Sequence, residues 1–406
     1  MRLLIVQYGG DYRETFYLVR NKGIETYNSQ KYVVDTITSI SKQIDEVILL
    51  CCNTKKTYNQ EIEPGLKVIA AGVEPYTNSH QILEIIQAQK PTHLIIHFPM
   101  TDIFNWAIKH QVKMVGLFAD CFLPISLKQR IKNYHQAKLF NHPQVDWVAN
   151  HGLNACYSLE KIGVKPNKII PWDWKYKITP QVFSAKQLKP NLSSISLVYV
   201  GLVQENKGVG DILTAVAKLQ DIQPINLKIA GSGNIEKFQH RAEELQISKQ
   251  IEFLGLIPQK QVIKLMRDAD AVIIPSWHRY PEACPLTIYE SLCAHTPIIA
   301  SDHPMFRGNL IHRQNAMVFR ERKPELLAQC IQELFADYEL YHQISLNSQV
   351  SWQHLQMPVK WGDLITNWLF DSPVNQKWLS ERSLSSGLYN QSKLESKFGT
   401  VLSSVS

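Results

Sequence analysis

Short, uninterrupted apolar runs alternate along this chain with longer amphipathic segments, and this alternation most constrains its fold. The runs are RLLIVQ (2–7), EVILLCC (46–52), THLIIHF (92–98), KMVGLFA (113–119), DWVAN (146–150), KII (168–170), SLVYVG (196–201), NLKIAG (226–231), IEFLG (251–255), DAVIIPS (270–276) and TPIIAS (296–301). Continuous apolar runs indicate strands buried on both faces, which is typical of parallel sheets covered by helices. An example of the intervening helices is GDILTAVAKLQ (210–220), with its apolar residues on one stripe. The sequence therefore predicts an α/β protein.

The runs fall into two series, separated by a stretch without apolar periodicity that contains Pro180 and Pro190. A chain of 406 residues is long enough for two domains, each with its own core. We expect two tandem Rossmann-like, doubly wound parallel-sheet domains with a cleft between them. The expected boundaries are 1–175 for the first domain, 176–194 for the linker, 195–350 for the second domain, 351–371 for helices that pack back on the first domain, and 372–406 for a polar, disordered tail.

Composition narrows the function classes. The net charge of +7 and pI of about 8.9 favour anionic ligands or contact with an anionic membrane surface. No Lys/Arg block or nucleic-acid motif accompanies the charge, so a nucleic-acid partner is not expected. The seven cysteines form no C-x-x-C pair and fit free thiols in a reducing compartment. The N-terminal run is too short for a signal peptide, and no stretch is long enough to span a bilayer. We expect a cytoplasmic protein, with peripheral contact at the inner face of the membrane left open.

The segment between the last two apolar runs carries the strongest functional signal. A polar loop, WHRYPEAC, follows the strand DAVIIPS, and Pro285 then stands where the first residue of a helix is expected. The unpaired amides of that first turn, at Leu286 and Thr287, point toward the strand end and form a site for phosphate. In doubly wound domains, ligands bind at this carboxyl edge of the sheet.

Two glutamates flank this helix start. Glu282 lies at its mouth, and Glu290 lies five residues beyond Pro285, roughly 7 Å along the helix axis. They are therefore too far apart to form an adjacent acid/base pair, and they would reach different parts of one extended ligand, such as a diphosphate-linked sugar. The alternative is that Glu282 is an ordinary first-turn acid and Glu290 a solvated helix residue.

The pattern S-x(5)-E-A-x-P-L-T-x-x-E-S-L-x-A-x-T-P-I-I-A-S, which begins at Ser276, resembles the E-x7-E donor-site signature of retaining GT-B glycosyltransferases of the glycosyl transferases group 1 (family four) type. The similarity is clear over residues 195–320. The resemblance implies that Glu282 contacts sugar hydroxyls and takes part in catalysis, and that Glu290 contacts the nucleotide ribose. It also implies that the backbone at Leu286 and Thr287 binds the diphosphate, and that no divalent metal ion is needed.

A second element, VYVGLVQENKG (198–208), resembles the family's G-R-L-x-x-x-K-G element, with Gly201 and Lys207 matching. Lys207 would neutralise the diphosphate, or is otherwise a surface lysine at a helix start. Leu202 replaces the arginine that the family has next to the glycine, and Arg279 is a candidate substitute. Gly231, in IAGSGN (229–234), would form a turn beside the nucleotide. That segment lacks the third glycine of a dinucleotide fingerprint, which disfavours a nicotinamide dehydrogenase.

Candidate residues of the first half follow its strands. Gly10 ends YGG (8–10) and is expected to bind the donor, because a glycine there lets the backbone approach a phosphate or sugar closely; the alternative is a plain turn. The loop is expected to run for about 15 residues, a length that suits acceptor binding. Asp120 aligns with a histidine that faces the sugar in the family, so the resemblance implies a catalytic sugar or acceptor contact; the alternative is the N-cap of the next helix. His97 is expected to be a hydrogen-bonded, partly buried histidine, and the alternative is a catalytic role.

Taken together, the sequence favours a GT-B enzyme that moves a sugar from a nucleoside diphosphate sugar to a glycan, lipid-linked or small-molecule acceptor with retention of configuration. It needs no cofactor beyond this co-substrate. Leu202 and Asp120 keep a catalytically silent nucleotide-sugar-binding relative open, and the architecture alone also allows a sugar-nucleotide epimerase or a scaffold without a nucleotide site.

Overall fold

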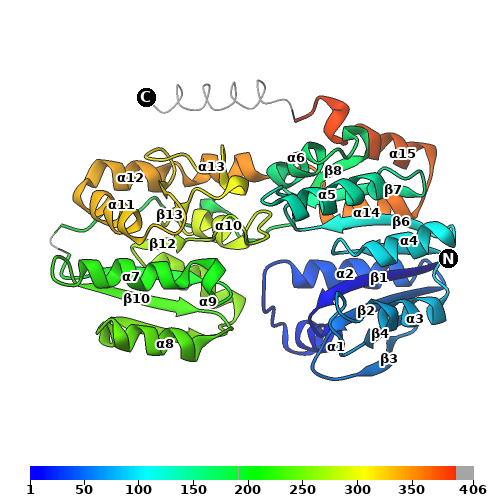
Figure 1. Cartoon of the computed structure of the whole chain (residues 1–406), viewed down its shortest axis with the longest axis horizontal. Helices are drawn as coiled ribbons and strands as arrows, with labels where there is room; N and C mark the ends of the chain where they lie inside the picture. Colours follow the sequence, from blue (N-terminus) through cyan, green and yellow to red (C-terminus); the bar gives the residue numbers. More distant parts are fainter. Residues whose placement is uncertain (191, 390–406) are drawn as a thin grey trace. The chain divides into compact units, whose positions relative to one another are not determined.

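The apolar runs form the strands of two separate parallel sheets. The computed structural model of the protein describes residues 1–190 and 192–389. The chain divides into two units (Figure 1): of the described residues, unit 1 contains Met1–Glu25, Ser29–Lys175 and 357–389, and unit 2 contains Thr26–Asn28 and 176–356. The expected α/β class with two Rossmann-like sheets is confirmed.

Unit 1 holds an eight-stranded sheet in the order β3-β4-β2-β1-β5-β6-β7-β8, parallel except where β3 pairs with β4. Its strands are β1 (Arg2–Gly9), β2 (Glu46–Asn53), β3 (Tyr58–Glu63), β4 (Leu66–Ala70), β5 (His93–Ile96), β6 (Lys113–Phe118), β7 (Val145–His151) and β8 (Ile169–Trp172). Its helices are α1 (Tyr12–Tyr17), α2 (Gln30–Ser41), α3 (Ser79–Gln89), α4 (Thr101–Lys109), α5 (Leu127–Phe140), α6 (Leu153–Lys161), α14 (Trp361–Leu369) and α15 (Pro373–Ser380), with shorter turns η1 (Leu18–Lys22), η2 (Pro166–Lys168) and η7 (Leu384–Ser386).

Unit 2 holds a six-stranded, all-parallel sheet in the order β11-β10-β9-β12-β13-β14. Its strands are β9 (Ile195–Val200), β10 (Ile225–Ala230), β11 (Ile251–Gly255), β12 (Ala271–Ile274), β13 (Ile298–Ser301) and β14 (Met317–Phe319). Its helices are α7 (Val209–Leu219), α8 (Ile235–Glu244), α9 (Gln259–Asp268), α10 (Leu286–Cys293), α11 (Pro324–Ala336), α12 (Tyr338–Leu346) and α13 (Ser348–Leu355), with turns η3 (Pro180–Val182), η4 (Glu205–Lys207), η5 (Ser248–Gln250) and η6 (Pro304–Phe306).

The central strands of each sheet are buried on both faces, as the continuous apolar runs require, whereas the edge strands β3 and β11 are partly exposed. In β1, Leu4 and Val6 face one core of unit 1, whereas Leu3 and Ile5 face a second core on the other side of the sheet. Trp361 and Leu364 of α14 belong to this second core. Figure 1 shows α14 beside the strands of the same unit, and the Trp368 indole donates to Asp146 of β7 at 2.8 Å.

Part of the stretch that we expected to be a disordered tail is folded, which corrects that expectation for residues 372–389. Ser372 caps α15 by accepting from the Asn375 amide, and Pro373 occupies the first turn. Leu379 of α15 and Tyr389 beyond it join the cores of unit 1. The rest of that stretch, residues 390–406, lies outside the described residues.

The expected long loop after the first strand is also corrected, because helix α1 and the π-helical turn η1 occupy most of it. The N-cap of α1 is Asp11, whose side chain accepts from the Glu14 amide. Residues 26–28 belong to unit 2, and unit 1 resumes at Ser29.

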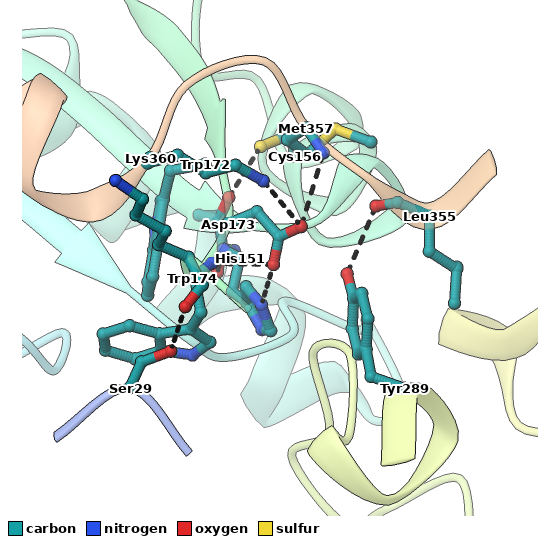
Figure 2. A network of polar contacts seen from close by, with 12 residues as sticks. Ser29, His151, Cys156, Trp172, Asp173, Trp174, Tyr289, Leu355, Met357 and Lys360 are labelled. Carbon is teal, nitrogen blue, oxygen red and sulfur yellow. Dashed lines mark hydrogen bonds and ion pairs between the residues drawn. The ribbon is translucent and has the colours of Figure 1, made fainter. Parts of the chain in front are cut away.

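One buried carboxylate joins the two places where the chain leaves and re-enters unit 1 (Figure 2). Asp173 is fully buried, and its oxygens contact His151 Nε2 at 3.1 Å, the Met357 amide at 3.4 Å and Lys360 Nζ at 3.5 Å. Its backbone N–H also donates to the carbonyl of Val359, in the segment that returns to unit 1, at 2.9 Å. Removing one partner from such a buried network leaves uncompensated polar groups, which is strongly destabilising.

We expect Asp173→Ala to lower the free energy of unfolding by about 3 kcal/mol, because it leaves the polar groups around the carboxylate without their acceptor. Urea unfolding followed by circular dichroism measures this change. As a control, Asp221→Ala alters an exposed aspartate and should change stability by less than about 0.5 kcal/mol. Equal effects of the two substitutions would contradict the structural role of Asp173.

Candidate active site

The strand order of unit 2 reverses direction between β9 and β12, which are adjacent in the sheet. A ligand of a doubly wound sheet binds at such a switch point, outside the carboxyl ends of the two strands. Gly201 and Lys207 follow β9, and the loop from Ser276 to Glu282 follows β12. The sheet topology therefore brings the two sequence motifs to one edge.

Lys207 and Glu282 are in direct contact at this edge. The ammonium group forms an ion pair with Glu282 Oε1 and lies 3.5 Å from Ser276 Oγ. Ser276 donates to the same carboxylate oxygen at 2.6 Å. Both charged side chains are largely buried, with 12% and 8% of their side-chain surface exposed. The two opposite charges thus neutralise each other in a partly desolvated position.

Gly208 allows Lys207 to reach this position. Its φ is +75°, a left-handed conformation, and a Cβ at this residue would lie 2.2 Å from the carbonyl oxygen of Pro275. Any other residue would collide with the end of β12. The Trp277 amide also donates to the Asn206 carbonyl at 3.0 Å, so backbone contacts hold the loop after β9 against the loop after β12.

Gly201 and Gly231 bring the loops after β9 and β10 into main-chain contact. Their φ angles are +152° and +144°, and a Cβ on Gly231 would lie 1.8 Å from the Gly201 carbonyl oxygen. No side chain larger than hydrogen fits there. The two glycines therefore let the loops after β9 and β10 pack directly against each other at the carboxyl edge of the sheet.

Helix α10 begins at Leu286, one residue later than expected. Pro285 precedes it with an extended ψ of 133°, so it is the N-cap residue and not the first helical residue. The Ile288 amide bonds to Pro285, whereas the amides of Leu286 and Thr287 have no backbone acceptor among the described residues. Both residues are half-buried, and their N–H groups are available to an anion.

Glu290 lies farther along α10, in a separate hydrogen-bond network. Its carboxylate accepts from Gln259 Nε2, at the start of α9, and burial raises its pKa to about 7. The two glutamates therefore do not share a proton in this structure: Glu282 is bound to Lys207 and Ser276, and Glu290 to Gln259. Burial of Glu290 also excludes the alternative that it is a solvated helix residue.

Gln259 is a contact that the sequence motifs do not reveal. It is the first residue of α9, with Pro258 as the N-cap, and it follows the segment FLGLIP (253–258). Nothing in its spacing relative to Glu290 indicates a pairing, because the two residues come from different helices.

Arg279 does not contact Glu282 or Lys207 in the structure. Its guanidinium is exposed and lies 4.6 Å from the ring centre of Trp277. Trp277 is fixed in turn by a 2.7 Å hydrogen bond from its indole to Asp211. Leu202 is 39% exposed, so its side chain leaves room at the position where the resemblance expects an arginine.

Two further side chains shape the loop after β12. His303 Nδ1 accepts from the Met305 amide at 3.2 Å, so its Nε2 carries the proton and donates to the Tyr280 carbonyl at 3.1 Å. Burial lowers the pKa of His303 to about 4, which keeps the ring neutral. The Tyr280 ring lies 4.5 Å from Lys207 Nζ. The hydrogen bond from His303 thus fixes the backbone of Tyr280, whose ring lies beside Lys207.

The remaining predicted residues, Gly10 and Asp120, belong to unit 1. Gly10 follows β1 with a φ of +92°, and no atom lies within 4 Å of the position of a Cβ. Asp120 follows β6, accepts from the Cys121 amide at 2.7 Å, and has a pKa raised to about 6 by burial. It is not the N-cap of the next helix, since Ser126 caps α5.

His97, at the end of β5, is partly buried as expected, and its ring has a hydrogen bond with the backbone of Leu117. Its buried Nε2 has no hydrogen-bond partner among the described residues. Burial lowers its pKa to about 4, so the ring is neutral. Its ring stacks on Trp361 with a centroid distance of 6.2 Å, which ties β5 to α14 within unit 1.

Within the described residues, no group of three or more His, Cys, Asp or Glu side chains has the arrangement of a metal site. No helix in that part of the chain has the length and apolar content needed to cross a bilayer.

Residues 182–350 match the family model described as glycosyl transferases group 1. Among curated proteins, the chain is similar to an uncharacterized glycosyltransferase of Methanocaldococcus jannaschii, with 22% identity over 59% of this chain and 57% of that protein. It is also similar to D-inositol 3-phosphate glycosyltransferase of Corynebacterium jeikeium, with 35% identity over 25% of this chain and 26% of that protein. These matches span between about a quarter and just over half of the relatives' length.

Solved structures resemble the chain over most of its length. Sucrose-phosphate synthase from Thermosynechococcus elongatus has a TM-score of 0.64 at 15% identity, covering 87% of this chain and 94% of that chain. HepE from Anabaena in complex with UDP-glucose has a TM-score of 0.63 at 12% identity, covering 94% and 98%. At such low identities the likeness establishes the GT-B fold. The match to the family model described as glycosyl transferases group 1, over residues 182–350, includes the donor-site motifs of unit 2.

Proposed function

We propose that this protein is a retaining glycosyltransferase that transfers a sugar from a nucleoside diphosphate sugar to an acceptor. The observation that carries the proposal is the edge of the unit 2 sheet, where Lys207, Glu282 and the first turn of α10 converge at the switch point. A cation and helix amides bind a diphosphate, and a neighbouring carboxylate accepts hydrogen bonds from sugar hydroxyls.

Each residue of unit 2 has a distinct role in this proposal. Lys207 and the amides of Leu286 and Thr287 bind the diphosphate and stabilise the charge that develops as it departs. Glu282 accepts hydrogen bonds from the sugar once Lys207 turns to the phosphates. Glu290, held by Gln259, accepts from the ribose hydroxyls. Gly201 and Gly231 let the backbone approach the nucleotide, and Arg279 is a second cation that can turn from Trp277 to the diphosphate.

For unit 1, we propose that Gly10 and Asp120 contact the transferred sugar or the acceptor. In the reaction, the bond between the anomeric carbon and the diphosphate breaks, and a bond to the acceptor oxygen forms on the same face. The acceptor proton passes to the departing diphosphate. Asp120, when ionised, stabilises positive charge that develops at the anomeric carbon.

The donor tested first should be UDP-glucose. The structurally similar HepE is described in complex with UDP and with UDP-glucose. The acceptor that we propose is a glycan, a lipid-linked sugar or a small molecule, and the site is cytoplasmic in this proposal. Lys207 and the helix amides supply the positive charge, so we propose that transfer proceeds without a divalent ion.

A second candidate function is binding of a nucleotide sugar without efficient transfer. Leu202 favours it, because it replaces one of the two expected cations and Arg279 lies over Trp277 in the structure. With a single cation at the diphosphate, binding would persist while departure of the diphosphate would be slow.

Titration calorimetry with UDP, GDP and ADP tests the assigned roles. We expect Lys207→Ala to weaken binding of the preferred nucleotide roughly 10- to 100-fold, because it removes a charge-assisted contact. Glu282→Gln should change nucleotide affinity less than about threefold but lower sugar transfer or donor hydrolysis roughly 100-fold or more. Lys249→Ala, an exposed lysine away from the site, is the matched control. Nucleotide binding that is the same in Lys207→Ala and in the parent would refute the site, provided thermal unfolding shows that both are folded.

Leu202→Arg distinguishes the two candidate functions. If the missing cation limits turnover, the new guanidinium should raise donor hydrolysis by about tenfold or more while nucleotide binding is retained. The exposed side chain at this position has space for arginine. Leu202→Gln is the uncharged control, and an equal rate in both variants would show that charge at this position does not limit the reaction.

The raised pKa of Glu290 predicts a pH dependence of stability. The folded protein keeps this proton up to about pH 7, whereas an unfolded glutamate loses it near 4.5, so the protonated group stabilises the fold at low pH and this contribution disappears as pH rises. Between pH 5 and pH 8, the unfolding free energy of the parent should fall by about 2.5 kcal/mol more than that of Glu290→Gln. Urea unfolding at both pH values measures the difference. The control Glu236→Gln, on the exposed surface of α8, should show the same pH dependence of stability as the parent. If Glu290→Gln also showed the pH dependence of the parent, burial of Glu290 would not be the cause.

A further inference from the structure

Helix α5 buries two amides beside its apolar residues Ala137 and Phe140, while three other large apolar side chains are exposed. Leu127, Ile131 and Tyr134 are 75%, 54% and 66% exposed, whereas Asn133 and Gln136 are buried against the body of unit 1. A helix of a globular domain normally keeps its large apolar side chains on the buried face and its polar side chains on the exposed face. One exposed apolar residue is ordinary in a globular protein. Three exposed apolar residues on a helix that buries two amides suggest that the exposed face has a binding partner.

The exposed apolar residues form one continuous stripe. Their spacing of four and then three residues places them one above the other on the same side of the helix. Ile125, directly before the helix, is 59% exposed and extends the stripe at its N-terminal end. Three successive turns of α5 therefore present an apolar edge to solvent.

The buried amides show that this orientation is fixed. Gln136 donates to the Pro99 carbonyl at 3.2 Å, and Asn133 accepts from Gln129 at 2.7 Å. The Asn133 Nδ2 atom is buried without a hydrogen-bond partner among the described residues. The Gln136 bond to Pro99 and the burial of Ala137 and Phe140 in the core hold α5 in place, so the apolar stripe cannot turn inward without losing these contacts.

Cations border the stripe. The helix contains Lys128, Arg130, Lys132 and Lys138, all exposed, and no aspartate or glutamate. Within the described residues, none of the four forms an ion pair. By helical angle, Lys138 lies within the stripe, Lys128 and Lys132 lie on one side of it, and Arg130 lies on the other. Of the four, Lys132 has a nearby carboxylate, Asp120: burial raises the pKa of that group, and the charge of Lys132 offsets part of the rise. An apolar edge bordered by exposed positive charge suits one kind of surface, an apolar interior beneath a layer of anions.

We propose that α5 docks unit 1 on an anionic lipid bilayer. Leu127, Ile131 and Tyr134 enter the boundary between headgroups and acyl chains, and the lysines and Arg130 bind lipid phosphates while their methylene stems lie along the apolar boundary. The helix lies in the plane of the membrane and does not span it. A second copy of the chain is disfavoured as the occupant, because it would bring the same cations against these.

The first test is co-sedimentation of the full chain, without nucleotide, with vesicles of phosphatidylcholine containing phosphatidylglycerol and with vesicles of phosphatidylcholine alone. We expect binding to the anionic vesicles, weak binding to the neutral ones, and a decrease with added salt. Equal sedimentation with both kinds of vesicle, or none with the anionic ones, would overturn the proposal.

The apolar stripe is tested by a triple variant, which should reduce binding to anionic vesicles at least tenfold. The variant is Leu127→Ser with Ile131→Ser and Tyr134→Ser. Its matched control removes three other exposed apolar side chains and should bind as the parent. The control is Val182→Ser with Ile222→Ser and Val374→Ser.

The cations are tested with two variants that each remove three positive charges, one on α5 and one elsewhere on the surface. Replacing three lysines of α5 should weaken binding roughly 100-fold, because each cation contributes about a fivefold factor at an anionic surface. The variant is Lys128→Gln with Lys132→Gln and Lys138→Gln, and its control is Lys42→Gln with Lys55→Gln and Lys249→Gln. An equal loss in the control would show that overall charge, and not α5, determines binding.

The remaining outcomes are also decisive. A concentration-dependent dimer that the apolar triple variant abolishes, without vesicle binding by the parent, would make this face a contact between copies and refute membrane docking. Vesicle binding does not require a nucleotide, so its failure is distinguishable from failure of the proposed donor site, which calorimetry measures separately.

Discussion

The buried carboxylate of Asp173 is the interaction on which the organisation of this chain depends. The chain leaves unit 1 just after this residue and re-enters it at Met357, and one side chain contacts partners from both stretches. Because α14 and α15 complete unit 1, this carboxylate connects the N-terminal sheet with the C-terminal helices that cover it. A neutral residue could not satisfy the Lys360 ammonium and the surrounding amides together.

At the switch point of unit 2, each largely buried ionisable side chain of the proposed donor site has a polar partner within the protein. Lys207 is bound to Glu282, and Glu290 to Gln259. In the proposed function, a diphosphate would compete with Glu282 for the lysine, and the released carboxylate would become available to the sugar. Such an exchange avoids leaving either charge buried and alone in the absence of ligand.

Much of this fold could be predicted because buried parallel strands have continuous apolar sequences. The strands that escaped prediction lack such runs: β3 is polar and lies at the sheet edge, β4 is interrupted by Lys67, and β14 is only three residues long. The helix α15 escaped because its signals are a cap and single buried residues in a polar stretch, not a periodic apolar face.

The candidate site was predictable only where a local pattern carries its geometry. Gly208 next to Lys207 and Pro285 before α10 are such patterns. The contacts from Gln259 and His303 are not, since each joins residues from different elements and depends on how the loops pack. For Asp120, the sequence left two interpretations open, and the cap of α5 by Ser126 removed one.

The return of the chain to unit 1 has a consequence for the order in which the protein can fold during synthesis. When residues 1–175 have left the ribosome, the face of the sheet that includes Leu3 and Ile5 still lacks Trp361 and Leu364 of α14. Domains generally fold as units while the chain emerges, the N-terminal one first. Here the segments of unit 2 up to Gln356 emerge before α14, so the unit that begins the chain is the last to receive all of its core. Until then its uncovered apolar face is the part of the nascent chain most exposed to aggregation and to chaperones.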